Sequence, residues 1–178
     1  MNHRKVAALA TVLLLTAAPA LAQEYEKKAE EAATATAEAA HVAIAAADVV
    51  WGPAPEGLPA GSELAVLSGD PSEEGLFIMR AKLPDGYRVP PHSHPKTESV
   101  TVISGTLGIS MGETLDEAAG TELGPGGLFV MPAETAHAAW AKGETVIQIN
   151  AEGPWGITYV NPADDPRTKT GEGAVIQE

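Results

Sequence analysis

The sequence predicts an all-β domain, an antiparallel barrel or jelly roll, preceded by one N-terminal α-helix. Short runs rich in β-branched and apolar residues recur through the middle of the chain. Turn signals built from Gly, Pro and Asp separate these runs, and no helical period lies between them. Many short strands joined by regular turns are typical of antiparallel barrels and jelly rolls.

Each predicted strand is a short run bounded by turn residues. The nine runs are Glu63 to Ser68, Leu76 to Leu83, Tyr87 to His92, Glu98 to Ser104, Thr106 to Met111, Leu128 to Met131, His137 to Ala141, Thr145 to Ala151 and Ile157 to Val160. The turns are at Gly69-Asp70-Pro71, Pro84-Asp85-Gly86, Ser104-Gly105 and Gly124-Pro125-Gly126-Gly127. We therefore place the barrel at residues 51–162.

The first 22 residues have the pattern of a cleavable signal peptide. A charged start with Arg4 and Lys5 precedes the apolar run VAALATVLLLTAA, and small residues around Ala22 suit a cleavage site. The apolar run is short for a permanent membrane span. We expect export to the periplasm or secretion, with cleavage near Ala22.

Residues 23–50 form an Ala/Glu-rich segment without Gly or Pro, which favours a helical arm. Prolines 53 and 55 are expected to end it. Because its apolar side is mostly alanine, the arm should be a spacer or lie against a partner subunit in a homodimer. His41 is interpreted as a solvated helix histidine. The tail, residues 163–178, has little apolar content and is expected to be largely disordered.

Charge and composition restrict the partners. The formal net charge of -13 argues against binding to nucleic acid or to anionic lipid surfaces, since both would be repelled. The chain has no cysteine, so a disulfide framework is excluded and any metal site must use nitrogen and oxygen ligands. A small-molecule partner fits best.

Candidate metal ligands concentrate in the stretch GYRVPPHSHPKTESVTVISG, from Gly86 to Gly105. His92, His94 and Glu98 all have even numbers, so an extended segment would direct them to one face. A further histidine, His137, follows in the run GGLFVMPAETAH.

These two stretches resemble the two sequence motifs of the cupin family. Gly86, His92, His94, Glu98 and Gly105 fill every position of the first motif, and Gly126, Pro132 and His137 match the second. The second motif departs at Glu134, where the family has Gly, and at Ala141, where it has Asn. The resemblance implies a cupin double-stranded antiparallel β-barrel with one metal ion held by His92, His94, Glu98 and His137.

The ligand types limit which metal is expected. Imidazoles with one carboxylate suit one divalent transition metal ion, Fe, Mn, Ni, Co, Cu or Zn, better than Mg or Ca. Four protein ligands leave positions open around an ion that accepts five or six, as in catalytic metal sites. The sequence does not distinguish among these six metals.

Six further residues are candidates for lining the barrel interior, and each can equally belong to the core or the rim. They are Arg80, Tyr87, Met131, Trp140, Gln148 and Trp155.

The function expected from these features is an exported metal-dependent enzyme, of dioxygenase type, acting on a small organic molecule. Glu98 is its candidate catalytic residue, as a ligand or a proton shuttle. Isomerase, lyase and hydrolase chemistry also occur on this fold, because one fold hosts many functions. The alternative is a non-catalytic periplasmic cupin that binds metal or a small ligand.

Overall fold

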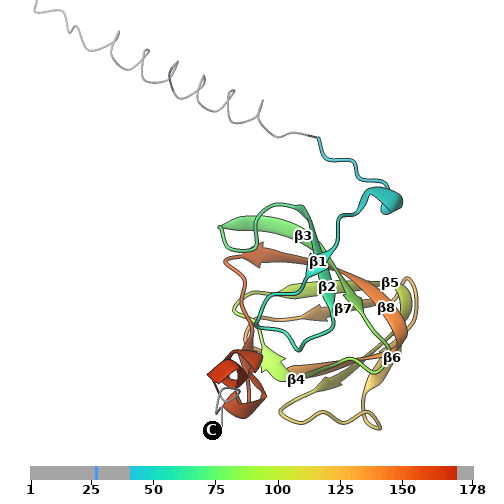
Figure 1. Cartoon of the computed structure of the whole chain (residues 1–178), viewed down its shortest axis with the longest axis vertical. Coiled ribbons are helices and arrows are strands. Elements are labelled where there is room, and N and C mark those ends of the chain that lie inside the picture. The colour runs from blue at the N-terminus through green and yellow to red at the C-terminus, as the bar shows by residue number, and fades with distance from the viewer. Residues whose placement is uncertain (1–26, 28–40, 172–178) are drawn as a thin grey trace, which may run out of the picture. The chain divides into compact units, whose positions relative to one another are not determined.

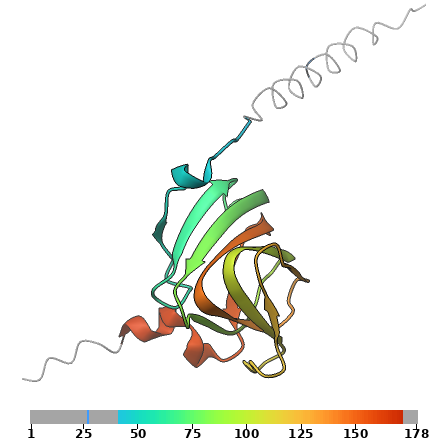
Figure 2. The same ribbon diagram turned by 90° about the vertical axis from the view of Figure 1, so that its right-hand side faces the viewer.

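The computed structural model describes Lys27 and residues 41–171. The chain divides into two units, Met1–Ala43 and Ile44–Glu178. Only Lys27 and residues 41–43 of the first unit are described, so the expected signal peptide and most of the expected helical arm lie outside the described residues. The second unit is a strongly curled antiparallel sheet (Figure 1) that wraps around an interior (Figure 2).

Nine strands build this sheet, and three short 3-10 helices flank it. The strands are β1 (Gly52–Pro53), β2 (Glu63–Ser68), β3 (Gly75–Leu83), β4 (Arg88–Ser93), β5 (Glu98–Met111), β6 (Thr121–Leu123), β7 (Leu128–Met131), β8 (His137–Gly153) and β9 (Thr158–Tyr159). The helices are η1 (Ala46–Asp48), η2 (Pro162–Asp164) and η3 (Pro166–Gly171). No helix in the described part of the chain has the length and apolarity needed to cross a membrane.

The two longest strands, β5 and β8, hold the barrel together because each belongs to both of its walls. The last part of β8 pairs with β3, whereas its first part pairs with β4. Likewise, the start of β5 pairs with β7 and its end pairs with β6. Since β5 and β8 also pair with each other along most of their length, they connect the two walls into one continuous sheet.

A sharp corner lets β5 and β8 pass from one wall to the other. Gly105 has φ +79°, and a Cβ there would lie 2.4 Å from the carbonyl oxygen of Glu144, so the turn requires glycine. Opposite it, the fully buried Thr145 accepts a hydrogen bond at Oγ1 from the amide of Thr106, at 3.1 Å. The pairing register shifts at this point, as expected where a strand bends.

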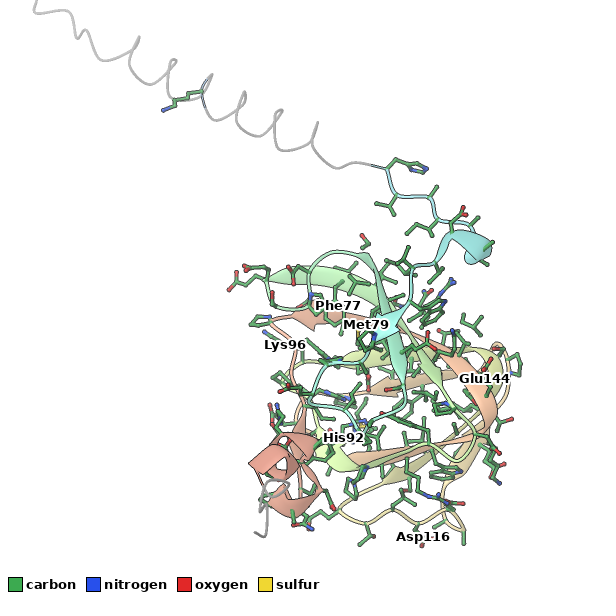
Figure 3. The ribbon with its side chains drawn as sticks, viewed as in Figure 1. Phe77, Met79, His92, Lys96, Asp116 and Glu144 are labelled. Carbon is green, nitrogen blue, oxygen red and sulfur yellow. The ribbon has the colours of Figure 1, made fainter. Side chains whose placement is uncertain are left out.

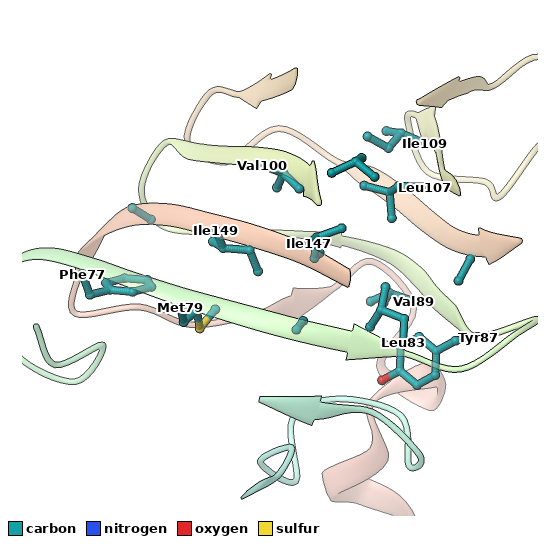
Figure 4. Close-up of a cluster of buried hydrophobic side chains, with 14 of the residues drawn as sticks. Phe77, Met79, Leu83, Tyr87, Val89, Val100, Leu107, Ile109, Ile147 and Ile149 are labelled. Carbon is teal, nitrogen blue, oxygen red and sulfur yellow. The ribbon is translucent and has the colours of Figure 1, made fainter. Parts of the chain in front are cut away.

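Alternation along the strands builds the interior. In β3, Phe77, Met79, Ala81 and Leu83 are buried while the residues between them are half-buried. Figure 4 shows such side chains projecting inward from β3, β5 and β8. This period of two separates an apolar interior from a more polar outer surface.

The cupin-type barrel predicted from the sequence is confirmed, with differences at strand ends. Glu63–Ser68 and Leu128–Met131 appear with the expected bounds. The expected pairs of strands on either side of Ser104-Gly105 and of Lys142 to Glu144 are each one continuous strand, β5 and β8. The glycine corner bends these strands and shifts their pairing register, but pairing resumes beyond it, so a turn signal in the sequence does not end a strand here.

The flanking segments also differ from expectation. Residues 41–45 are without helix and only Ala46–Asp48 form a 3-10 turn, so the helix expected to reach about Asp48 does not do so. The tail expected to be disordered from Ala163 instead forms η2 and η3 as far as Gly171. Asn161 accepts a hydrogen bond from the amide of Ala163, and Arg167 pairs with Asp165. This local hydrogen bond and this ion pair stabilise the two 3-10 helices, although the segment has few apolar residues to bury.

Candidate metal centre

The four candidate ligands come from three neighbouring strands, β4, β5 and β8, and from the segment between β4 and β5. His92 lies near the end of β4 and pairs in register with His137, the first residue of β8. His94 follows the end of β4, and Glu98 begins β5. The three side chains of the first motif come together, but not on one extended strand as expected, because residues 94–97 lie outside the strands between β4 and β5. Figure 3 shows His92 inside the barrel, whereas Lys96, Asp116 and Glu144 lie at its periphery.

All four side chains are more than nine-tenths buried. One ring nitrogen from each of His92, His94 and His137 can be chosen so that the three lie within 4.8 Å of one another. The three rings come close, with centroid separations of 4.3 to 5.4 Å. Three imidazoles at this spacing can coordinate a single ion.

Backbone carbonyl oxygens fix the orientation of each imidazole. The Nδ1 atom of His92 lies 2.7 Å from the carbonyl oxygen of Pro90, and that of His94 lies 2.7 Å from the carbonyl oxygen of Gly156. His137 makes the same contact with Thr135, at 3.0 Å. A carbonyl oxygen only accepts hydrogen bonds, so each Nδ1 carries the proton and each Nε2 keeps a lone pair. Second-sphere carbonyls of this kind orient metal-binding histidines.

Glu98 adds a carboxylate to this cluster of lone pairs. Its Oε2 lies 3.5 Å from Nε2 of His137 and 3.7 Å from Nε2 of His94. Both separations exceed an ordinary hydrogen bond. In their neutral form the three imidazoles present acceptor Nε2 atoms beside this carboxylate, an arrangement of buried acceptors that a cation would satisfy. The residues present therefore fit a metal ion.

Burial favours the neutral form of two of the imidazoles, those of His92 and His94. Burial, together with the neighbouring rings of His137 and His94, lowers the pKa of His92 from 6.5 to about 3. Burial also lowers the pKa of His94, although the nearby Glu98 acts in the opposite direction. A low pKa keeps the Nε2 lone pair available to a metal at neutral pH.

The segment after β8 supports His94 from two sides. Trp155 stacks on the His94 ring with centroids 4.2 Å apart and planes 16° from parallel. Gly156 supplies the carbonyl that accepts from Nδ1. Trp155 is itself held by an amide hydrogen bond to Pro71 and an edge contact with Phe77. Stacking and hydrogen bonding together leave the His94 ring little freedom.

The first departure from the second cupin motif, Glu134, occupies the backbone conformation that a glycine favours. Glu134 has φ 59°, and it is the only residue other than glycine with positive φ in the described part of the chain. Its amide donates a hydrogen bond of 2.8 Å to the carbonyl oxygen of His94. The turn of the second motif therefore supports His94, a ligand of the first motif. It does so with the backbone of Glu134 in the left-handed conformation, which is sterically unfavourable for a residue with a Cβ atom.

The second departure, Ala141, is part of the barrel core. It is buried, and its main chain exchanges hydrogen bonds with Tyr87 and Gly86. An apolar residue at this position removes a polar group from the interior without leaving a buried donor or acceptor.

A cavity of about 630 Å³ extends from the metal centre through the barrel. All four candidate ligands line it. Much of the remaining wall is apolar, formed by Leu58, Leu64, Met79, Ala81, Leu83, Val89, Val100, Leu107, Ile109, Phe129, Ala139, Ile147, Ile149, Trp155 and Ile157. This volume is within the range of small-molecule sites in proteins.

Two of the six candidate lining residues, Tyr87 and Trp155, line this cavity. Arg80, Met131, Trp140 and Gln148 do not, which corrects the expectation for them. Arg80 and Gln148 pair across β3 and β8 and hydrogen-bond to each other at 3.2 Å, on the face opposite Met79 and Ile149.

Trp140 and Met131 are both buried but away from the cavity. Trp140 pairs with Gly108 and packs against it and against Gly120 on the outer face of the wall. Met131 pairs with Glu98 on the neighbouring strand, so both side chains lie on the same face of the sheet, yet Met131 is not among the residues that line the cavity. For Trp140 the pairing register, which the sequence does not show, decides where the side chain lies.

The sequence alone does not mark the apolar lining as part of a site. Alternation in β3 and at the end of β8 could have indicated which residues face inward, but it does not show that the interior is hollow. The carbonyls of Pro90, Thr135 and Gly156 leave no signal in the sequence, because any residue supplies a carbonyl.

Comparisons with known proteins agree with this fold. A family model described as "Domain of unknown function (DUF4437)" matches residues 17–158. No curated protein matches the sequence.

Two solved structures show the same architecture. The polyketide cyclase RemF from Streptomyces resistomycificus has a TM-score of 0.59 and 18% identity, covering 71% of this chain and 90% of its own. An RmlC-like cupin from Shewanella frigidimarina NCIMB 400 has a TM-score of 0.50 and 13% identity, covering 64% of this chain and 91% of its own. At these identities the likeness concerns the fold.

Proposed function

Because the chain belongs to the DUF4437 family and has the cupin fold, we propose that it is a metal-dependent enzyme acting on a small organic molecule. His92, His94, His137 and Glu98 would hold one divalent transition metal ion. The observation that carries this proposal is the buried set of Nε2 lone pairs and one carboxylate at the end of a cavity. A metal ion at this centre can act on a substrate only if a small molecule can reach it, and the cavity provides that access.

Oxygenase-type chemistry is the reaction we favour. A bound divalent ion would supply Lewis-acid chemistry and, for iron, manganese or copper, redox chemistry. Four protein ligands leave coordination positions for small molecules. The polyketide cyclase RemF is one enzyme with this fold, but its reaction does not follow for this chain.

The residues around the centre have separate roles in this proposal. The carbonyls of Pro90, Thr135 and Gly156 keep Nε2 of the three histidines directed at the ion. Glu98 can bind the ion or accept a proton from a substrate beside it. The apolar walls exclude water, which strengthens the electrostatic interactions at the centre.

Metal analysis followed by an activity screen tests this proposal. Protein purified from its native compartment should contain about one transition metal ion per chain. The loaded protein should consume dioxygen or convert some compound in a library of small organic molecules, and chelated protein should not. A loaded protein that converts nothing would favour the non-catalytic binding role instead.

We also propose that the protein is exported after cleavage near Ala22. The charged start, the apolar run and the small residues before Gln23 support this. Mass spectrometry of the protein from separated cell fractions should find a chain beginning near Gln23 outside the cytoplasm. An intact chain in the cytoplasm would contradict export.

A further inference from the structure

The wall of the cavity carries very little charge. Among the described residues that line it, Glu98 is the only carboxylate side chain and Arg167 the only guanidinium, and none is a lysine or an aspartate. Glu98 belongs to the metal centre. Arg167 lies in η3, where its Nε and one terminal nitrogen contact the carboxylate of Asp165 at 2.8 and 2.7 Å. A charged group on a ligand would therefore have to compete with an ion pair or with the metal centre.

The polar groups of the wall are also provided with partners. The Tyr87 hydroxyl donates to the carbonyl oxygen of Pro59 at 2.6 Å and lies 2.9 Å from the Ser62 hydroxyl. Its hydrogen-bonding needs are met within the protein, so it does not require a polar group on a ligand. Ser72, whose hydroxyl donates to Asp70, is exposed.

The remaining wall is a continuous apolar surface drawn from several strands. Met79, Ala81 and Leu83 come from β3, while Ile147 and Ile149 come from β8. Figure 4 shows Met79, Ile147 and Ile149 within the same cluster. Burying a charge against such a wall is costly, whereas burying apolar surface there is favourable.

From this distribution we infer that the cavity takes an uncharged, mainly apolar organic molecule whose single polar group faces the His92, His94, His137 and Glu98 cluster. The apolar part of this inference rests on the cavity wall alone. The orientation of the polar group rests on the proposed function, because it requires a metal ion in the cluster. The class excludes sugar phosphates, nucleotides and organic acids that carry several charges.

Two related dyes test the inference on the full chain. N-phenyl-1-naphthylamine is uncharged, and 8-anilino-1-naphthalenesulfonate has the same aromatic skeleton with one added sulfonate. Both fluoresce more strongly in apolar surroundings. The uncharged dye should bind one site per chain, with an affinity at least about tenfold higher than that of the sulfonate. Equal affinities, tighter binding of the sulfonate, or no binding of the uncharged dye would overturn the inference.

A pair of variants on one strand locates the bound dye. Ala81→Phe places a phenyl ring on the cavity wall, whereas Ile78→Phe places the same ring on the outer face of β3, where Ile78 pairs with Asn150. Ala81→Phe should weaken dye binding by at least about tenfold, and Ile78→Phe should leave it within about twofold. Circular dichroism checks that each variant folds. Ala139→Phe, on β8, makes the same test from another wall should Ala81→Phe not fold. Unchanged dye affinity in the folded wall variant would contradict the assignment.

Repeating the titration with chelated and metal-loaded protein separates this inference from the proposed function. Dye binding that persists without any metal binding would support the apolar cavity and contradict the metal centre. Metal binding without dye binding would support the metal centre and contradict the apolar cavity. A short-chain ligand with a metal-binding end, such as a hydroxamate with an alkyl tail, should bind more tightly to the loaded form. Equal binding to both forms would contradict the orientation of the polar group.

Discussion

Two parts of the cavity wall are built on different principles, and we call the cluster of His92, His94, His137 and Glu98 the polar end and the apolar lining the apolar end. At the polar end each imidazole depends on one named carbonyl, as His94 does on Gly156. At the apolar end many side chains share the same task, and Ile147 and Ile149 are two of several that line the wall. Hydrogen bonds are directional and hydrophobic contacts are not. The polar end should therefore depend strongly on single residues, while the apolar end should tolerate conservative changes.

The largest expected difference between the two ends is in metal affinity. His94→Ala removes one of the three clustered imidazoles and should lower the affinity for a divalent transition metal by at least about 100-fold. Ile149→Val, which removes one methyl group from the apolar wall, should leave that affinity unchanged. Titration of chelated protein with Zn²⁺ or Fe²⁺ measures both. Equal affinities in the two variants would contradict the assignment of the polar end as the metal centre.

The second difference is in the stability gained from metal. The ligands come from β4, β5, β8 and the turn after β4, so an ion would cross-link the folded state. At a concentration of about 100 times Kd this stabilises the fold by roughly 2.7 kcal/mol, or a rise in Tm of roughly 5 to 10 °C. Ile149→Val should show the same rise from a lower starting Tm. In His94→Ala the rise should be absent, and a full rise there would place the metal elsewhere.

Acid should destabilise the polar end of the metal-free protein. The pKa of His92 is about 3 in the folded state and 6.5 in the unfolded chain. The unfolded state therefore binds more protons between these values, and stability falls as pH decreases from 6.5 towards 3. For this one group the unfolding equilibrium constant rises about tenfold per pH unit. Urea unfolding at a series of pH values measures the slope.

A substitution at His92 provides the control for this slope. His92→Gln removes the group that titrates, so its stability should depend on pH less steeply than that of the wild type. Above pH 6.5 the wild-type curve should be flat with respect to this residue, because both states are neutral there. A wild-type stability that does not change between pH 6.5 and 4 would contradict the neutral, buried state of this imidazole.

The smallest expected effect is at Glu134, in the turn that supports His94. Glu134→Gly should raise the free energy of unfolding by about 1 kcal/mol, because glycine adopts positive φ without steric cost. Glu134→Ala keeps the Cβ atom and should give no such gain. Thermal unfolding of the two variants decides this, and an equal gain in both would assign the effect to the glutamate side chain rather than to the backbone.

Several features of the centre could be predicted from sequence because they depend on neighbours along the chain. His92 and His94 are two residues apart, and Glu98 follows four residues after His94. The first motif can therefore be recognised from the spacing of these three residues. His137 is distant in the chain, so it could be identified as a ligand only through the resemblance to the second cupin motif. The strand Leu128–Met131 is bounded by Gly127 and Pro132, and its local signals agree with its place in the fold.

Other expectations failed where long-range pairing prevailed over local signals. Ser104-Gly105 reads as a turn between two strands, but pairing with β8 continues β5 through it. The arm near His41 has helix propensity, yet residues 41–45 are not helical, and propensity alone is a weak guide without packing. Arg80 and Trp140 are typical of binding sites, but their register places them away from the cavity.

The all-β class and the spacing of His92, His94 and Glu98 could be predicted from the sequence, because periodicity, turn chemistry and spacing are local properties, and the resemblance to the cupin motifs added His137. The carbonyls that hold the imidazoles, the stacking of Trp155 on His94 and the weakly charged cavity depend on the tertiary structure. These features join residues that are far apart in the chain. They arise when the long strands β5 and β8 bend and pair, since the register of that pairing sets which side chains face inward.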